Sequence, residues 1–254
     1  MRYKKKKDSG LGKFILSIFL IALGYLALTI IGNIAYDYIR SNQPIDTSIT
    51  TTAEEENTEA ILLATKLKLT AANIYIQVYY DSGYEIGSGT IINEDESYYY
   101  ALTNYHVIDG NNEVIDSKLA ITFDDVSSDF EVVAMNQDRD LALIKIVKTG
   151  RDGIIPLNLA GNVVHVNEIA VAIGNPFGEI GTINYGSVLR ATYLQELELS
   201  HSVIEHNATL ANGSSGGALV DLYGNLIGIN TWELNGKYYA IPISVINIFL
   251  ENIL

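Results

Sequence analysis

A serine flanked by glycines carries the strongest chemical signal in this sequence. Residues 212–219 read NGSSGGAL, with Ser215 between Ser214 and Gly216. A serine hydroxyl is a weak nucleophile at neutral pH, so a catalytic serine needs a base beside it and amide N–H groups aimed at the developing oxyanion. Glycines let backbone amides approach a substrate carbonyl without obstruction by a Cβ atom. Ser215 is therefore a candidate nucleophile, and a flexible Gly/Ser turn is the alternative for the same segment.

Two other segments supply partners for such a serine. His106, in TNYHVI at 103–108, follows a strand-like segment and is a candidate general base, although a single histidine is more often structural. Asp140 precedes the apolar residues 141–146, where a carboxylate would orient the imidazole and stabilise its protonated form. Asp138 is a second candidate for this acid or simply a turn residue. We favour Asp140 because it directly adjoins the predicted strand.

Taken together, these motifs resemble the protease domain of the HtrA/Deg family, within the chymotrypsin-like serine proteases. The matching segments run in family order across residues 70–247: TNYHVI at 103–108, DLA at 140–142, AIGNPFG at 172–178, GSSGG at 213–217 and IGIN at 227–230. The resemblance implies an all-β fold of two antiparallel six-stranded β-barrels, with the catalytic residues in the cleft between them. It also implies peptide-bond hydrolysis through an acyl-enzyme.

The resemblance assigns a role to each candidate residue. Ser215 attacks the scissile carbonyl, His106 takes and returns the proton, and Asp140 fixes the imidazole tautomer. The N–H groups of Gly213 and Ser215 form the oxyanion hole, with the N–H of Ser214 turned toward the same cavity. We expect Thr209 at the base of the substrate-binding pocket. Its walls are expected to be formed by Ile229, Asn230, Thr231 and Ala240. None of them supplies a buried carboxylate, so we expect cleavage after small or medium-sized aliphatic residues.

The oxyanion segment departs from the family pattern at two positions. Asn212 stands where the family usually has proline, and Ser214 stands where it has asparagine. The first change is expected to loosen the turn, and the second removes an amide side chain. These departures motivate an alternative function, a catalytically weak binding or scaffold module that keeps the protease fold.

Composition excludes several other classes of protein. The chain has 254 residues, a net charge of −14 and no cysteine, so thiol catalysis, disulfides and cysteine-ligated zinc are excluded. Such an acidic chain would repel phosphate backbones, so we expect no nucleic-acid partner. His165, His201 and His206 lack paired ligand spacing, and we expect neither a metal nor a cofactor. An α/β-hydrolase would place its histidine after the serine, whereas every histidine here precedes Ser215.

The N-terminal part reads as a membrane anchor. Residues 1–13 hold six Lys/Arg against one acid, and residues 14–35 carry no charge, which is about the length of a membrane-spanning helix. A cleaved secretory signal is the alternative. We expect a cytoplasmic tail over 1–13, a single-pass anchor in the cell membrane over 14–38, a linker with a short helix over 39–69, and an extracytoplasmic protease domain over 70–254.

Within the protease domain, short Val-, Ile- and Tyr-rich segments punctuated by Gly, Asn or Asp predict strands. A helix is expected over 59–69, and strands over 73–80, 89–92, 98–103, 118–123, 141–146, 168–173, 218–220 and 226–230. Because eleven residues follow Ile243, we do not expect the PDZ domain that the family often carries. Protein substrates, a role in protein quality control and a possible homotrimer are implied by the resemblance alone.

Overall fold

The computed structural model describes residues 53–109, 115–148, 153–161, 164–192, 201–251 and 253. The predicted basic tail and the predicted anchor over 14–38 lie outside these residues. Among the helices that are described, none combines the length and the apolar character needed to span a bilayer.

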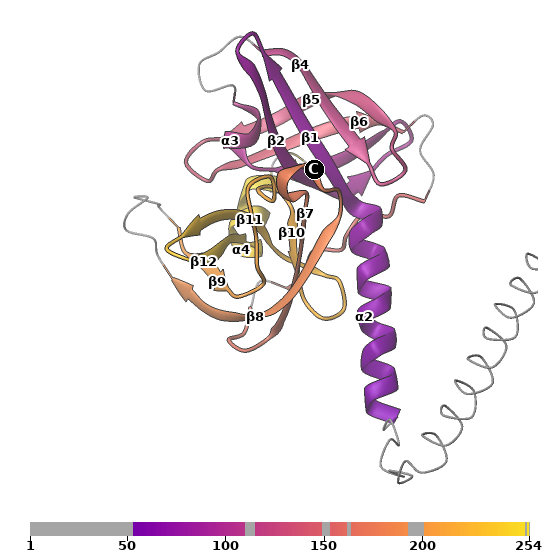
Figure 1. Cartoon of the computed structure of the whole chain (residues 1–254), viewed down its shortest axis with the longest axis vertical. Coiled ribbons are helices and arrows are strands. Elements are labelled where there is room, and N and C mark those ends of the chain that lie inside the picture. Colours follow the sequence, from indigo (N-terminus) through magenta and orange to yellow (C-terminus); the bar gives the residue numbers. More distant parts are fainter. Residues whose placement is uncertain are drawn as a thin grey trace, which may run out of the picture. The chain divides into compact units, whose positions relative to one another are not determined.

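Six strands form a first closed barrel, which Figure 1 shows in indigo to pink. They are β1 (Asn73–Tyr80), β2 (Gly83–Glu94), β3 (Tyr98–Thr103), β4 (Ile115–Thr122), β5 (Ser127–Asn136) and β6 (Leu141–Val147). Their order around the barrel is β1-β2-β3-β6-β5-β4, and antiparallel pairing of β4 with β1 closes it. Closure pairs the backbone groups that an open sheet edge would leave exposed.

Six further strands form a second closed barrel with the same antiparallel character. They are β7 (Ile169–Gly174), β8 (Thr182–Thr192), β9 (Val203–His206), β10 (Ala218–Val220), β11 (Leu226–Leu234) and β12 (Lys237–Pro242). The order is β10-β11-β12-β9-β8-β7, closed by pairing of β7 with β10. The two six-stranded antiparallel barrels that the resemblance implies are therefore confirmed.

The barrel interiors follow from strand periodicity. In β1, Ile74, Ile76 and Val78 point to one face, and each is completely buried. Burying an aliphatic side chain of this size stabilises the fold by about 1.5–3 kcal/mol. One continuous apolar cluster extends from these residues to Ile229 and Ile241 of the second barrel, so the barrels share a core rather than merely touching.

Helix α2 (Ala53–Ala72) leads directly into β1 and begins six residues before the predicted helix over 59–69. One side of it packs on the turn that joins β10 and β11. There, the Thr65 hydroxyl donates to Leu222 O at 2.7 Å and Lys68 Nζ donates to Tyr223 O at 3.0 Å. Leu69 is completely buried in the shared core. The helix therefore contacts the second barrel while it is continuous with the first.

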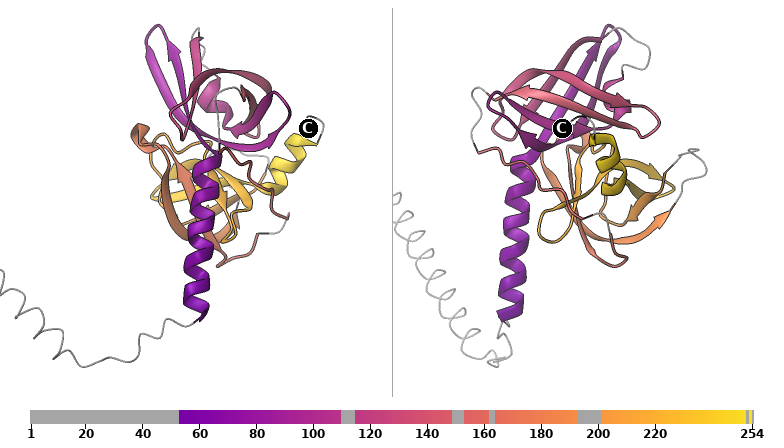
Figure 2. Two further views of the ribbon diagram at one scale, coloured as in Figure 1. Left: turned by 90° about the vertical axis from the view of Figure 1, so that its right-hand side faces the viewer. Right: turned by 180° about the vertical axis from the view of Figure 1, so that it is seen from behind.

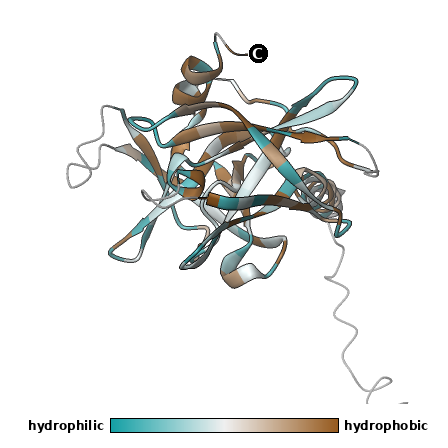
Figure 3. Ribbon diagram, turned by 90° about the horizontal axis from the view of Figure 1, so that it is seen from above, coloured by the Kyte–Doolittle hydropathy of each residue, from teal (hydrophilic) through white to brown (hydrophobic). Residues whose placement is uncertain are grey.

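Helix α4 (Ile243–Leu250), which the sequence analysis did not predict, follows the last strand. Pro242 precedes its first turn, where the missing N–H has no intrahelical partner to lose. The helix lies apart from α2 (Figure 2) and is largely hydrophobic (Figure 3), and most of its side chains are buried in the shared core.

Candidate active site

The structure brings His106 and Asp140 into direct contact. His106 belongs to the one-turn helix α3 (Tyr105–Ile108), and Asp140 immediately precedes β6. Imidazole Nδ1 lies 2.8 Å from Asp140 Oδ2 and 2.9 Å from Oδ1, and the backbone N–H of His106 donates to Oδ1 at 3.0 Å. Asp138 is exposed in the preceding turn. Of the two candidate acids, Asp140 is the one that can fix the imidazole.

Asp140 itself is held in an unusual conformation. Its φ angle is 50°, in the left-handed region that non-glycine residues rarely occupy. The side-chain amide of Asn104, which is completely buried, donates to the Asp140 carbonyl at 2.9 Å. The hydroxyl of Thr231 donates to Asp140 Oδ2 at 2.7 Å. These two contacts fix both the backbone and the carboxylate of Asp140.

The surroundings of His106 favour its protonated form. Burial, the largest single influence, disfavours the charged imidazole, but the hydrogen bond and charge of Asp140, assisted by Asp109 and Glu85, outweigh it. The pKa of His106 therefore lies above its usual value of 6.5. A proton taken up by this ring during a reaction would be stabilised by the carboxylate behind it.

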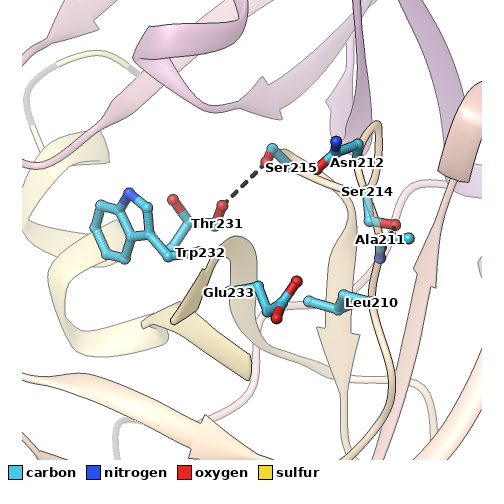
Figure 4. Close-up of a pocket in the computed structure, with 8 residues that line it drawn as sticks. All are labelled: Leu210, Ala211, Asn212, Ser214, Ser215, Thr231, Trp232 and Glu233. Carbon is cyan, nitrogen blue, oxygen red and sulfur yellow. Dashed lines mark hydrogen bonds between the residues drawn. The ribbon is translucent and has the colours of Figure 1, made fainter. Parts of the chain in front are cut away.

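The hydroxyl of Ser215 has a different partner in this structure. Its Oγ donates to the backbone carbonyl of Thr231 at 3.0 Å, as the dashed line in Figure 4 shows. Among the described residues, no hydrogen bond joins Ser215 to His106. Thr231 connects Ser215 to Asp140 instead, because its hydroxyl donates to Asp140 while its carbonyl accepts from Ser215. A change of χ1 is a fast motion of a side chain, and it can free the hydroxyl from Thr231.

Gly213 adopts φ +100°, and a Cβ atom at this position would lie 2.5 Å from Asn175 O, so only glycine fits. The N–H of Phe177 donates to Asn212 O at 2.8 Å. In a planar trans peptide the N–H and C=O point in opposite directions, so this bond turns the N–H of Gly213 away from Phe177. Within the described chain, neither the N–H of Gly213 nor that of Ser215 donates to another protein group.

The amide of Ser214 differs from its neighbours. Its N–H donates to Ala211 O at 2.9 Å, which closes a turn. This N–H therefore already has an acceptor, in contrast to the expectation that it joins the oxyanion hole. The two unoccupied amides, those of Gly213 and Ser215, are the ones that can bind an anionic oxygen.

A small cavity of about 140 Å³ adjoins Ser215 (Figure 4). It is lined by Leu210, Ala211, Asn212, Ser214, Ser215, Thr231, Trp232 and Glu233.

Of the five predicted substrate-binding residues, only Thr231 is in this lining. Ile229, Asn230 and Ala240 are completely buried and do not line this cavity. Thr209 is exposed and does not line this cavity.

Sequence reasoning did not assign five of the lining residues to the site, namely Leu210, Ala211, Asn212, Trp232 and Glu233. Of these, Trp232 and Glu233 belong to β11. A register shift in the pairing of β11 with β12 occurs between Asn230 and Trp232. Such a bulge changes which side chains face outward beyond it. The carboxylate of Glu233 is exposed and brings a negative charge to the wall. The position of Trp232 and Glu233 close behind the IGIN segment at 227–230 was the only signal for them in the sequence.

In the part of the chain that the structure describes, no three metal-ligating side chains of His, Asp or Glu cluster together. The chemistry that this geometry can support is proton transfer between a hydroxyl and a carboxylate-backed imidazole, next to two free amide donors.

Comparison with known proteins gives a consistent result. The sequence profile of the family described as "Trypsin-like peptidase domain" matches residues 87–229. The serine endoprotease DegS of Escherichia coli strain K12 is 28% identical over 253 residues, which cover 92% of this chain and 68% of that protein. The periplasmic serine endoprotease DegP of Salmonella typhimurium is 40% identical over 170 residues, which cover 63% of this chain and 34% of that protein.

Solved structures of similar proteins agree with the observed fold. The HtrA-type protease AlgW with a tripeptide has a TM-score of 0.66 and 27% identity, covering 76% of this chain and 63% of that one. A serine endoprotease from Yersinia pestis has a TM-score of 0.64 and 26% identity. The chain spans about a third of the length of several curated relatives, such as the probable serine protease do-like of Buchnera aphidicola, of which it covers 34%.

Proposed function

Because the chain belongs to the trypsin-like peptidase family, we propose that it is an HtrA-type serine endopeptidase that acts through Ser215, His106 and Asp140. The observation that carries this proposal is the 2.8 Å contact between His106 Nδ1 and Asp140, with Thr231 connecting Asp140 to Ser215. Asp140 and Thr231 thereby connect His106 and Ser215, which come from distant parts of the sequence.

In the proposed mechanism, the Nδ1–H of His106 donates to Asp140, which leaves the Nε2 lone pair free to accept a proton. Ser215 rotates away from the Thr231 carbonyl and transfers its proton to Nε2 while Oγ bonds to the scissile carbonyl carbon. The imidazolium then protonates the leaving amine, and an acyl-enzyme forms. A water molecule, deprotonated by the same imidazole, releases the product acid.

The N–H groups of Gly213 and Ser215 are proposed to bind the oxyanion of each tetrahedral intermediate. Both amides lack a protein acceptor in the described chain. Loss of one such donor typically lowers kcat about 10²–10³-fold.

The residue preceding the scissile bond is proposed to be a small or medium-sized aliphatic one. Leu210 and Ala211 give the cavity an apolar side, where each buried CH₂ of a substrate contributes about 0.8 kcal/mol. A Lys or Arg of the substrate could pair with Glu233, but this carboxylate is exposed to solvent. Such an exposed ion pair contributes about 0–1 kcal/mol to binding. Profiling the cleavage products of a denatured protein tests this preference, and dominant cleavage after Lys or Arg would contradict it.

We further propose that residues 14–38 anchor the chain in the cell membrane as a single-pass helix, with residues 1–13 in the cytoplasm and the peptidase outside it. The support is the uncharged apolar run over 14–35 behind a basic segment, together with relatives named as periplasmic endoproteases. Cleavage of misfolded proteins and assembly as a homotrimer extend the proposal by analogy with the HtrA family.

The alternative function is a binding or scaffold module with weak catalysis. It is motivated by Asn212 and Ser214, which replace the usual residues of the oxyanion segment, and by the hydroxyl of Ser215, which is bonded to Thr231. In this case the cavity would bind peptide segments without cleaving them.

Labelling with a fluorophosphonate distinguishes the two functions. The full chain is expected to react covalently at one residue, and Ser215→Ala is expected to abolish labelling while Ser214→Ala preserves it. Absence of labelling of the unmodified chain, with or without unfolded protein as an activator, would favour the scaffold.

A further inference from the structure

Three polar side chains are buried beneath the oxyanion segment, where the two barrels meet. Asn73 is 2% exposed, and Ser88 and Asn175 are completely buried. They come from β1, β2 and the turn after β7, respectively. Burying polar groups is costly unless each finds a hydrogen-bond partner, so their arrangement requires an explanation.

The hydroxyl of Ser88 uses its full hydrogen-bonding capacity, which is one donor and two acceptor sites. It donates to Gly213 O at 2.7 Å, and it accepts from Asn175 N and Asn175 Nδ2, both at 2.9 Å. One hydroxyl of the first barrel therefore contacts two separate loops of the second barrel, the oxyanion segment and the turn at Asn175.

The side chain of Asn175 extends this connection. Its Nδ2 also donates to Ile74 O at 2.8 Å, and its Oδ1 accepts from Asn73 Nδ2 at 2.8 Å and from Gly181 N at 2.9 Å. These bonds fix the turn that contains the short helix η2 (Pro176–Gly178). The same turn presents the N–H of Phe177 that holds Asn212 O.

Both peptide planes beside the Cα atom of Gly213 are thereby fixed. The plane before it is held through Asn212 O by the turn that Ser88 and Asn175 stabilise. The plane after it contains the carbonyl of Gly213 and the N–H of Ser214. The carbonyl accepts from the Ser88 hydroxyl, and the N–H donates to Ala211 O. With both planes fixed, the direction of the Gly213 N–H is set.

We propose that Ser88 is a positioning residue for the oxyanion hole, and that its hydroxyl in the first barrel keeps the N–H of Gly213 in its productive direction. The inference rests on the peptidase function proposed above. Ser88 does not touch the substrate, so its loss should lower kcat and leave substrate binding nearly unchanged.

The test compares Ser88→Ala with Thr90→Val in the full-length chain. Thr90 is a matched control on the same strand: it is 1% exposed, and its hydroxyl donates to Gly216 O at 3.2 Å, beyond Ser215 rather than before it. With a fluorogenic peptide carrying valine before the scissile bond, Ser88→Ala is expected to lower kcat about 10–100-fold, less than or equal to the loss of one oxyanion donor. KM should stay within about 3-fold, because ground-state binding is retained.

Affinity for a peptide aldehyde, whose adduct places an oxyanion in the hole, should fall in parallel with kcat in Ser88→Ala. Thr90→Val should keep both quantities within about 3-fold of the unmodified chain, because Gly216 O is not part of the hole. Ser88→Thr, which retains the hydroxyl, should recover most of the lost kcat. If Ser88→Ala does not fold, Asn73→Ala tests the same network at Asn175 and should lower kcat about 3–10-fold at constant KM, because the hole is misaligned but not dismantled.

An unchanged kcat in the folded variants, or equal losses in Ser88→Ala and Thr90→Val, would overturn the positioning role. Failure of the peptidase function looks different, because the unmodified chain would then neither cleave the peptide nor bind the aldehyde.

Discussion

Acidification is expected to lower the free energy of unfolding of this protein through the buried side chain of His206. Replacing His206 with leucine should therefore make the protein less sensitive to acid. His206 is 1% exposed on β9, between β8 and β12, and within the described residues neither ring nitrogen has a partner at hydrogen-bond distance. Its nearest ring neighbour is Tyr238, with centroids 6.2 Å apart. Burial lowers the pKa of His206 to about 4, and the nearby backbone of Ala208 opposes this shift only in part.

The sign of the effect follows from proton binding. The unfolded chain takes up a proton at His206 near the usual value of 6.5, whereas the folded chain takes it up only near 4. Between these values the unfolded state binds more protons, so the free energy of unfolding falls as the pH is lowered. Between about pH 7.5 and about pH 4.5, this one group is expected to remove about 2–3 kcal/mol of stability.

Urea unfolding at these two pH values measures the effect. The unmodified chain and His206→Leu are compared, and the difference between their pH dependences isolates His206 from every other titrating group. His165→Leu is the matched control, because it makes the same substitution at an exposed position. The slopes of the unfolding curves must agree among the variants for the comparison to hold.

The reasoning would be refuted by a His206→Leu variant that loses as much stability on acidification as the unmodified chain. Equal changes of the pH dependence in His206→Leu and His165→Leu would likewise show that the burial of His206 is not the cause.

Three further predictions concern the site and the core. Because the pKa of His106 is raised, the acid limb of the pH profile of kcat/KM is expected above the usual histidine value, and a limb below that value would contradict the proposed base. Gly216→Ala is expected to lower the free energy of unfolding by more than about 2 kcal/mol, because the φ of Gly216 is +89° and a Cβ atom would lie 2.0 Å from Ser88 O. An unchanged urea midpoint would show that the loop relaxes freely and would contradict this reasoning. Leu102→Ala, at a completely buried position, should lower the free energy of unfolding by about 2–5 kcal/mol. Leu63→Ala, at a position 59% exposed, should change it by less than about 0.5 kcal/mol in the same assay, and equal losses would contradict the burial argument.

Strands with a strong local signal were predicted closely. The predicted segments 73–80, 98–103 and 218–220 coincide with β1, β3 and β10, because each is a short apolar or aromatic run that is followed by Asp or Asn. The order of motifs along the chain, through the family resemblance, supplied the double-barrel topology, which local patterns alone do not specify.

Strands whose burial depends on distant partners were missed. β9 contains Glu205 and His206, which no hydrophobic pattern would place inside a barrel. The buried carboxylate of Glu205 is paired with two cations. Arg190 Nε of β8 lies 2.7 Å from Glu205 Oε2, and Lys237 Nζ of β12 lies 3.6 Å from Glu205 Oε1. Since these partners are distant in sequence or separated by turns, the burial of β9 could not be read from its own residues.

At the candidate site, too, residues with a local sequence signal were predicted and those that depend on tertiary structure were missed. Asp140 was chosen over Asp138 from its position beside a strand, and the structure places Asp140 against His106. The double role of Thr231 and the wall formed by Trp232 and Glu233 depend on a strand bulge, which no residue type signals. A tertiary irregularity therefore decides which side chains meet a substrate.

The expected loosening of the oxyanion segment by Asn212 also depends on context. The bond that orients this segment uses the backbone carbonyl of Asn212, a group that proline would supply equally. The contacts at Gly213 and Ser214 are likewise made by main-chain atoms. A comparison of side-chain types alone therefore says little about how well this segment is held.

Helix α2 has a mechanical consequence for the whole peptidase. Its C-terminal end continues into β1, while Thr65 and Lys68 fasten it to the β10–β11 turn of the other barrel. A pull along the helix axis is thus resisted at two places, by a strand of one barrel and a turn of the other. Because His106 follows β3 of the first barrel and Ser215 precedes β10 of the second, a load on this helix and the relative position of these two residues are coupled through the same pair of attachments.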